Sequence, residues 1–118
     1  LDTRLLRLVR LRRDGDRPLA ILQNWLPPDY SDISREELEQ DGLYALLRSR
    51  GGKPVVAHQR IGARQPSSGE RKHLRLAASQ PVLTMTRTAF DAVGKPVEYG
   101  DHCYRAQDYA IEVTLDER

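Results

Sequence analysis

The sequence predicts a single α+β domain in which short helices flank an antiparallel β-sheet. Apolar stretches rich in β-branched residues come in pairs joined by short turns containing Gly or Pro, which is typical of β-hairpins. Two segments between these pairs begin with helix-capping signatures. The length of 118 residues, with 39% hydrophobic and 31% charged residues, suits one globular domain spanning residues 1–118.

The N-terminal part of the chain predicts a β-hairpin. Residues 4–12 combine Leu, Val and Arg in a stretch typical of a strand. Residues 14–18, with the sequence DGDRP, are expected to form a turn, after which residues 19–25 return as the second strand. Pro27 and Pro28 end this strand because proline has no N–H group to donate to a neighbouring strand.

The middle of the chain predicts two helical segments separated by a strand. Residues 34–49 begin with the Ser-x-x-Glu spacing of a capping box, and Gly42 is expected to divide this helix into two. Residues 54–64 predict a strand. Residues 67–78 again begin with the Ser-x-x-Glu spacing and predict a second helical segment.

The last third of the chain predicts three strands in close succession. They are placed at residues 82–90, 96–105 and 109–115. A turn at residues 91–94 joins the first two, and a short loop at residues 106–108 precedes the third. Hairpins with helices inserted between them indicate an antiparallel sheet of the α+β class.

Enzyme signatures are missing from the sequence. It contains no nucleophile elbow, phosphate-binding loop or dinucleotide-binding glycine motif. His102 and Cys103 are adjacent, so on a strand they point to opposite faces and cannot bind one metal ion together. Cys103 is expected to be a small buried apolar side chain, and His58 and His73 to be structural or exposed. We therefore predict no catalysis, no cofactor and no metal site.

Charge and cysteine content give two further expectations. The net charge is only +2, yet six arginines lie within the first seventeen residues against three aspartates. This cluster favours an anionic partner, either nucleic acid or a small ligand, although a solvated strand face would have the same composition. A single cysteine excludes an intrachain disulfide and, with no apolar run long enough to span a membrane, favours a cytoplasmic protein without membrane contact.

A polar row is predicted on the strand at residues 96–105. The two-residue period of a strand places Glu98, Gly100, His102 and Tyr104 on one face. A buried carboxylate needs polar partners, so this row is better suited to the floor of a polar ligand site than to a core, with Gly100 leaving room. A row that simply faces solvent is the alternative.

The same period places Arg10 and Arg12 on one face of the first strand. Two parallel guanidinium groups suit a phosphate, sulfate or carboxylate. Across the sheet they could face Glu98, either as a plain ion pair or as the opposite ends of a pocket.

Several of these residues form a familiar pattern. Residues 82–91, residues 94–99 and Tyr104-Arg105 resemble the closing hairpin of the UTRA domain, the effector-binding domain of HutC-type GntR transcriptional regulators. That hairpin has an apolar-Arg-Thr strand, an Asp-x-x-Gly-x-Pro-Val-Glu-Tyr turn and a Tyr-Arg pair. Arg10-Leu11-Arg12 and the helical motif Leu43-Tyr44-x-Leu46-Leu47 also match, so the resemblance covers essentially the whole chain in order.

The resemblance implies a chorismate-lyase-like fold and a repressor whose operator binding is modulated by a small anionic metabolite. It also implies a homodimer formed through this domain. The winged helix-turn-helix domain of such regulators is not in this chain, so operator DNA is expected to be contacted only through that N-terminal domain.

The resemblance further implies a set of site residues. In phosphosugar-sensing relatives the ligand is held by side chains that match both arginines of the first strand, the turn glutamate and the tyrosine of the closing hairpin. His102 shares their face and is expected to make effector affinity sensitive to pH near 6.5. Two positions differ from the family pattern: Leu22 stands where a glutamate is common, and Gly42 stands where a serine is common. The loss of a partner for a sugar hydroxyl and of a donor to a phosphate argues against an amino-sugar phosphate as the effector. The predicted effector site comprises Arg10, Arg12, Tyr44, Glu98, His102 and Tyr104.

Two other functions remain open at this point. An enzyme of the same fold acting on a small carboxylate would have to use Glu98 and His102 as its acid and base. A basic nucleic-acid-binding domain would use the N-terminal arginines, but that stretch lacks the interleaved aromatic residues such proteins favour.

Overall fold

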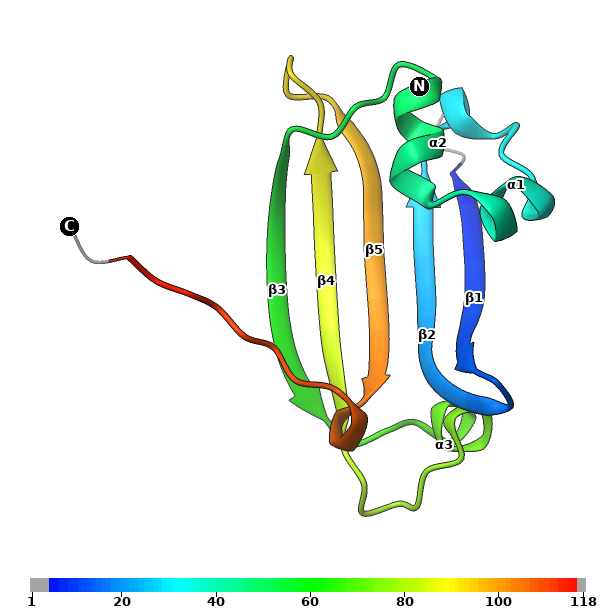
Figure 1. Ribbon diagram of the computed structural model, residues 1–118, viewed down its shortest axis with the longest axis vertical. Helices are drawn as coiled ribbons and strands as arrows, with labels where there is room; N and C mark the ends of the chain where they lie inside the picture. The colour runs from blue at the N-terminus through cyan, green and yellow to red at the C-terminus, as the bar shows by residue number, and fades with distance from the viewer. Residues whose placement is uncertain (1–4, 117–118) are drawn as a thin grey trace.

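The computed structural model describes residues 5–116 and contains one five-stranded antiparallel sheet (Figure 1). The strands lie in the order β1-β2-β5-β4-β3. Their bounds are β1 (Leu6–Asp14), β2 (Arg17–Leu26), β3 (Val56–Arg64), β4 (Val82–Phe90) and β5 (Pro96–Arg105). All five match predicted strands to within a few residues, and residue 4, the first of the predicted opening strand, lies outside the described residues. The predicted α+β antiparallel fold is confirmed.

Glycines form the two tight hairpin turns as expected. Gly15, between β1 and β2, has a φ of 60°, and Gly94, between β4 and β5, has a φ of 83°. A side chain at either position would be strained in this left-handed region. The second turn is held by the Asp91 carboxylate, which accepts hydrogen bonds from the backbone N–H groups of Val93 at 3.1 Å and Lys95 at 2.9 Å.

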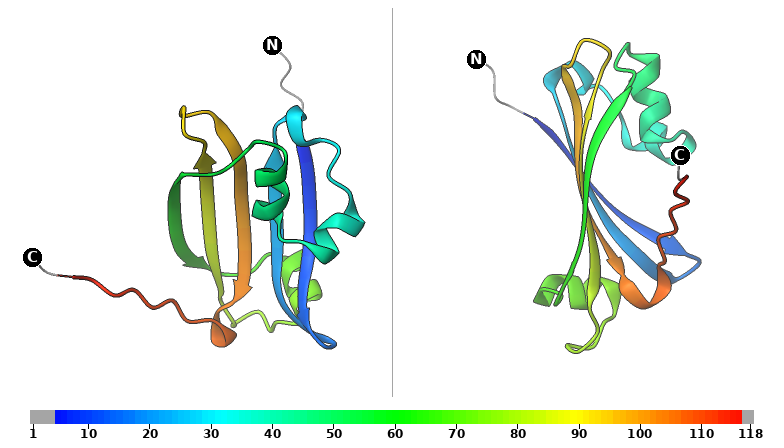
Figure 2. Two further views of the ribbon diagram at one scale, coloured as in Figure 1. Left: turned by 45° about the horizontal axis from the view of Figure 1, so that its top comes forward. Right: turned by 90° about the vertical axis from the view of Figure 1, so that its left-hand side faces the viewer.

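Two short helices cover one face of the sheet at the end where β2 finishes (Figures 1 and 2). They are α1 (Arg35–Gln40) and α2 (Leu43–Ser49), divided at Gly42 as predicted, and a one-turn helix η1 (Pro28–Tyr30) precedes them. Leucines of α2 pack on buried residues of the sheet, and this forms the largest hydrophobic cluster. Its members include Leu26, Leu43, Leu46, Leu47, Ala89 and Val97.

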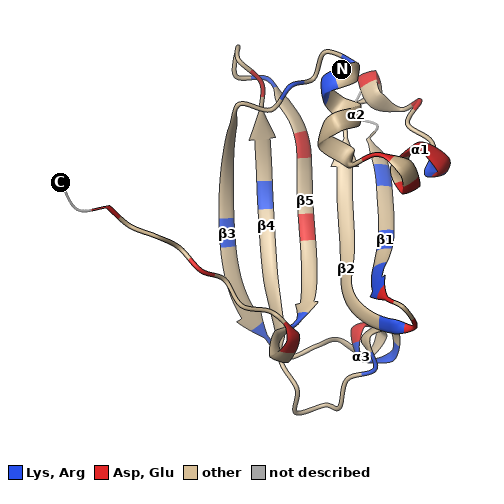
Figure 3. Ribbon diagram, in the orientation of Figure 1, with Lys and Arg blue, Asp and Glu red and all other residues tan. Residues whose placement is uncertain are grey.

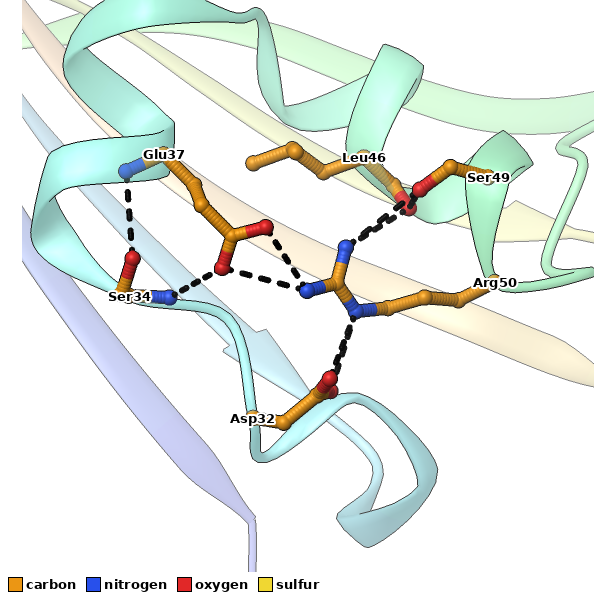
Figure 4. Close-up of polar contacts among 6 residues, drawn as sticks. All are labelled: Asp32, Ser34, Glu37, Leu46, Ser49 and Arg50. Carbon is orange, nitrogen blue, oxygen red and sulfur yellow. Dashed lines mark hydrogen bonds and ion pairs between the residues drawn. The ribbon is translucent and has the colours of Figure 1, made fainter.

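A polar network fixes the two helices relative to each other (Figure 4). Ser34 and Glu37 form the predicted capping box, with reciprocal hydrogen bonds of 3.1 Å. Arg50, just after α2, donates to the Glu37 carboxylate at 2.9 and 3.1 Å and to Asp32 at 3.0 and 3.1 Å. Glu37, which completes the capping box of α1, is thereby tied to the end of α2.

The helix α3 (Ser68–Leu74) is shorter than predicted and lies on the opposite face of the sheet. It ends early because Arg75 adopts a left-handed conformation with a φ of 55°. Leu74 packs against Val82 and Cys103. Cys103 is buried as expected, and burial raises the pKa of its thiol to about 12. No helix among residues 5–116 is long and apolar enough to cross a membrane.

The predicted strand at residues 109–115 is not formed. After β5 a one-turn helix, η2 (Ala106–Asp108), redirects the chain, and the following residues run extended away from the sheet (Figure 1). Both sides of β5 are already occupied by β2 and β4, so a strand that follows it has no free edge beside it. The prediction of a strand here was wrong, because the alternating pattern indicates extended backbone but does not show that a neighbouring strand is available.

Candidate functional site

The polar row predicted on β5 is buried. Glu98 is 2% exposed, and His102 and Tyr104 are each 6% exposed. They share one face of the sheet with Gly100, and α2 covers this face. The alternative of a solvent-facing row is therefore wrong.

A cavity of about 310 Å³ lies between this face and the start of α2. Every strand except β3 contributes to its wall, as does the residue that caps α2. The lining residues are Arg10, Arg12, Leu22, Asn24, Gly42, Leu43, Tyr44, Arg87, His102 and Tyr104. Five of the six predicted site residues thus surround one cavity, and Leu22 and Gly42, the two departures from the family pattern, also line it.

Glu98, the sixth predicted residue, lies beneath the cavity rather than in its wall. Its side chain has no exposed area. One carboxylate oxygen accepts a hydrogen bond from the Tyr44 hydroxyl at 3.0 Å, and the other accepts from the Asn24 amide at 2.9 Å. Arg87 Nε lies 3.6 Å away. Glu98 therefore positions three residues that do line the cavity, and in this arrangement it does not face a ligand.

Gly100 leaves room for this carboxylate and not for a ligand, which corrects the sequence-based interpretation. A Cβ atom at Gly100 would lie 2.7 Å from Glu98 Oε2 and 3.2 Å from His102 Nε2. The missing side chain is what allows Glu98 to fold back over the strand toward Asn24.

Two arginines of the cavity have buried donors without a hydrogen bond in the described part of the chain, although Arg87 Nε forms a long ion pair with Glu98. Arg10 donates from Nη2 to Asn24 Oδ1 at 2.9 Å. The Nε atoms of Arg10 and Arg87 are buried and have no hydrogen-bond partner among the described residues. Burial lowers the pKa of Arg10, and the nearby Arg12 lowers it further. An anion would supply both the acceptor atoms and the charge that this corner lacks.

His102 is held in its neutral form. Burial, followed by the charges of Arg87, Arg10 and Arg12, lowers its pKa to about 4. Its Nδ1 lies 3.0 Å from the Tyr104 hydroxyl. The expectation that His102 titrates near pH 6.5 is therefore wrong, because strand parity identifies the face of the residue but not the cations that surround it.

Tyr44 joins α2 to the sheet. The guanidinium of Arg87 lies over its ring, 4.9 Å from the centroid, while its hydroxyl donates to Glu98. Burial and the neighbouring Glu98 raise the pKa of Tyr44 to about 12, so its hydroxyl stays protonated and can keep donating.

Asn24 and Arg87 were missed as site residues. On β2 the inward positions are Ala20, Leu22, Asn24 and Leu26, and a buried amide among apolar side chains was a signal that could have been used. Arg87 pairs in register with Gly100, so it belongs to the same face as the polar row. That relation depends on the pairing of β4 with β5 and was not considered from the sequence.

A larger groove of about 690 Å³ lies between β1 and α1. It runs along the outer edge of the sheet and is lined by Arg7, Val9, Arg13, Arg35 and Glu39 among others. The groove shares Arg10 with the smaller cavity, but its other charged side chains are exposed, whereas the smaller cavity also gathers the buried polar residues Asn24 and His102. The smaller cavity is therefore the candidate binding site.

Comparisons with known proteins agree with the geometry. The UTRA domain family model matches residues 1–110. A putative transcriptional regulator from Streptomyces coelicolor is 44% identical, with a TM-score of 0.91 over 99% of this chain and 78% of that chain. The effector domain of PhnF from Mycobacterium smegmatis shares the fold at 21% identity, with a TM-score of 0.84 over 96% of this chain and 70% of that one.

A curated relative shows how much of a whole regulator this chain represents. The HTH-type transcriptional regulator Rv0792c of Mycobacterium tuberculosis is 32% identical in an alignment of 108 residues that covers 87% of this chain. The matched part is 40% of the length of that relative. With its matching fold and its family-model match over nearly the whole length, the chain belongs to the UTRA domain family.

Proposed function

We propose that this chain is the effector-binding domain of a HutC-type GntR transcriptional regulator that acts as a repressor. In this proposal the domain binds a small anionic metabolite in the 310 Å³ cavity. The observation that carries the proposal is the buried Nε atom of Arg10, which has no hydrogen-bond partner among residues 5–116, beside Arg87, whose Nε has only a long ion pair of 3.6 Å with Glu98. A buried donor without an acceptor costs free energy, and an anionic ligand would recover it.

The charge balance of the cavity supports an anion. Arg10, Arg12 and Arg87 line it, and the carboxylate of Glu98 beneath it is already engaged by Tyr44 and Asn24. We assign the anionic end of the metabolite to the arginines. Tyr44, Tyr104 and His102 form walls with polar tips, and the cavity volume is within the range of small-metabolite sites.

Catalysis is not part of the proposed function. Of the acid-base pair that an enzyme of this fold would need, Glu98 has no exposed area and His102 has a pKa of about 4. The matched proteins are named as regulators. The arrangement supports binding without chemical conversion.

The regulatory part of the proposal concerns the whole protein. We propose that it works as a cytoplasmic homodimer and contacts operator DNA only through a winged helix-turn-helix domain outside this chain. Effector binding would alter the relation between the two DNA-binding domains of the dimer. The basic residues of β1 (Figure 3) then serve the effector site and the surface instead of a DNA groove.

A thermal-shift screen tests the effector site. The chain would be heated with phosphorylated sugars, organic acids and acidic amino-acid derivatives, each beside a neutral analogue. A true effector at a hundred times its Kd should add about 2.7 kcal/mol of stability. We expect at least one anion to stabilise the chain while its neutral analogue does not. Stabilisation by neutral compounds alone would contradict the proposal.

A further inference from the structure

Arginines enter the effector cavity from two opposite sides. Arg10 and Arg12 come from the edge strand β1 and Arg87 comes from β4, while β2 and β5 lie between these strands. Arg10 is anchored over β2 by its hydrogen bond of 2.9 Å to Asn24. Arg87 is anchored over β5 by its ion pair of 3.6 Å with Glu98. The positive charge of the cavity is therefore divided between two fixed places.

The two anchoring residues lie on adjacent strands. β2 and β5 are neighbours in the sheet, and the backbones of neighbouring strands are about 4.8 Å apart. The Asn24 amide also donates to Glu98 at 2.9 Å, which ties the two anchors to each other. A molecule with an anionic group at each end of a short chain is long enough to span such a gap.

The arginines outnumber the acidic groups beside them. Three arginines line the cavity, and of the described residues in its wall none is acidic. Glu98 beneath the cavity supplies one negative charge, which leaves a surplus of two positive charges. His102 adds none, because its pKa of about 4 keeps it neutral. A ligand with a single carboxylate would leave one of the two arginine positions without a counter-charge.

The middle of the cavity is apolar. Leu22 lies in register between Arg10 on β1 and His102 on β5, and it is 4% exposed. The neighbouring Asn24 amide is already used at both ends, since its Oδ1 accepts from Arg10 and its Nδ2 donates to Glu98. Neither side chain offers a free partner to a ligand hydroxyl.

The hydroxyl groups around the cavity are engaged as well. The Tyr44 hydroxyl donates to Glu98 at 3.0 Å, and the Tyr104 hydroxyl lies 3.0 Å from His102 Nδ1. A ligand hydroxyl in the middle of the cavity would be buried against Leu22 or would have to break one of these contacts, and either costs free energy. The centre of the cavity therefore favours a carbon chain without hydroxyl groups.

We infer that the effector is a short aliphatic dicarboxylate, with one carboxylate at Arg10 and Arg12, the other at Arg87, and its carbon chain over Leu22. The inference rests on the anionic effector of the proposed function and names its chemical class. A sugar phosphate matches neither feature of the cavity, because it carries both charges on one group and several hydroxyls on its body.

Three sets of matched compounds test the inference on the wild-type chain. Calorimetric titration at neutral pH would compare succinate, glutarate and adipate with their monoamides, which keep the shape but lose one charge. The same acids would be compared with tartrate, xylarate and galactarate, which keep both charges but add hydroxyls. The best dicarboxylate should bind about tenfold or more tightly than its monoamide, because Arg87 loses a charged partner. It should exceed its hydroxylated counterpart by a similar factor.

Arg87→Gln tests the second anionic position. The ratio of affinities between the dicarboxylate and its monoamide should fall to about one, because both ligands then bind only Arg10 and Arg12. Arg60→Gln removes an exposed arginine on the opposite face of the neighbouring strand β3 and should keep the wild-type ratio. Arg87→Lys keeps a positive charge and should retain most of the preference, which separates the loss of charge from the loss of packing on the Tyr44 ring.

The outcomes separate this inference from the proposed function. A monoamide or a hydroxylated acid that binds as tightly as the dicarboxylate would overturn the dicarboxylate and leave an anionic effector in place. Failure of all three dicarboxylates to bind would also overturn it, and the proposed function would fall with it only if no other anion of the thermal-shift screen stabilises the chain. A wild-type ratio retained in Arg87→Gln would show that the second carboxylate is not held by Arg87.

Discussion

The Tyr44 hydroxyl donates a hydrogen bond to Glu98 at 3.0 Å and thereby joins the covering helix α2 to the floor of the cavity. Glu98 holds Asn24 with its other oxygen, and Asn24 in turn accepts from Arg10. One buried carboxylate thus orients a helix residue and, through an amide, an arginine of the edge strand β1.

This relationship predicts a measurable coupling between Tyr44 and Glu98. Tyr44→Phe should lower the free energy of unfolding by about 1 kcal/mol, because Glu98 loses one donor. Glu98→Ala should cost about 3 kcal/mol or more, because Arg87, Asn24 and Tyr44 would lose their shared acceptor. Urea denaturation of both single variants and of the double variant would measure the coupling. Strictly additive effects would show that the hydrogen bond contributes nothing to stability.

Arg10 should be essential for effector affinity but not for folding. Arg10→Ala is expected to cost about 1.5–3 kcal/mol of binding free energy, the range for a hydrogen bond to a charged group. Arg13→Ala, an exposed arginine of the same strand that does not line the cavity, is the matched control. Calorimetric titration with an anion identified by the screen would compare them. Equal affinities for the two variants would remove Arg10 from the site.

His102 should make the fold, rather than the binding site, sensitive to acid. Its pKa in the folded chain is about 4, below the 6.5 of an ordinary histidine. Between these values the unfolded chain binds a proton that the folded chain does not, so stability is complete above about pH 6.5 and falls as the pH approaches 4. The loss amounts to about 2–3 kcal/mol.

Denaturation at several pH values would measure this slope. His102→Gln should flatten it between pH 4 and 6.5, whereas His58→Gln, on the exposed strand β3, should keep the wild-type slope. Effector affinity should change little between pH 6 and 8, because His102 stays neutral there. A wild-type slope retained in His102→Gln would assign the effect to another group.

Gly100 should not tolerate even a methyl group. In Gly100→Ala the new Cβ would lie 2.7 Å from Glu98 Oε2, so the carboxylate must move away from Asn24. We expect a loss of about 1–3 kcal/mol in unfolding free energy, the cost of overpacking a well-packed site. Gly69→Ala, in α3, meets nothing within 4 Å and should be neutral or stabilising. Equal stability of the two variants would show that Glu98 can move freely.

Local patterns in the sequence were enough to predict most of the fold and part of the site. The period of two along a strand placed Glu98, His102 and Tyr104 on one face, and it placed Arg10 with Arg12. The Ser-x-x-Glu spacings located the starts of α1 and α3. These features depend only on neighbours a few residues away, so a single sequence contains them, and the family resemblance arises from the same short motifs.

Tertiary structure decided what those side chains contact. The partners of Glu98, the inclusion of Arg87 and the lowered pKa of His102 all depend on which strands are neighbours and on how much water the helix α2 excludes. The segment of residues 109–115 has a strand pattern, yet it forms no strand because both edges of β5 are taken. Register and burial join residues that are far apart in the chain, so the alternation of residue types determines the face of each side chain while only the folded sheet determines its environment.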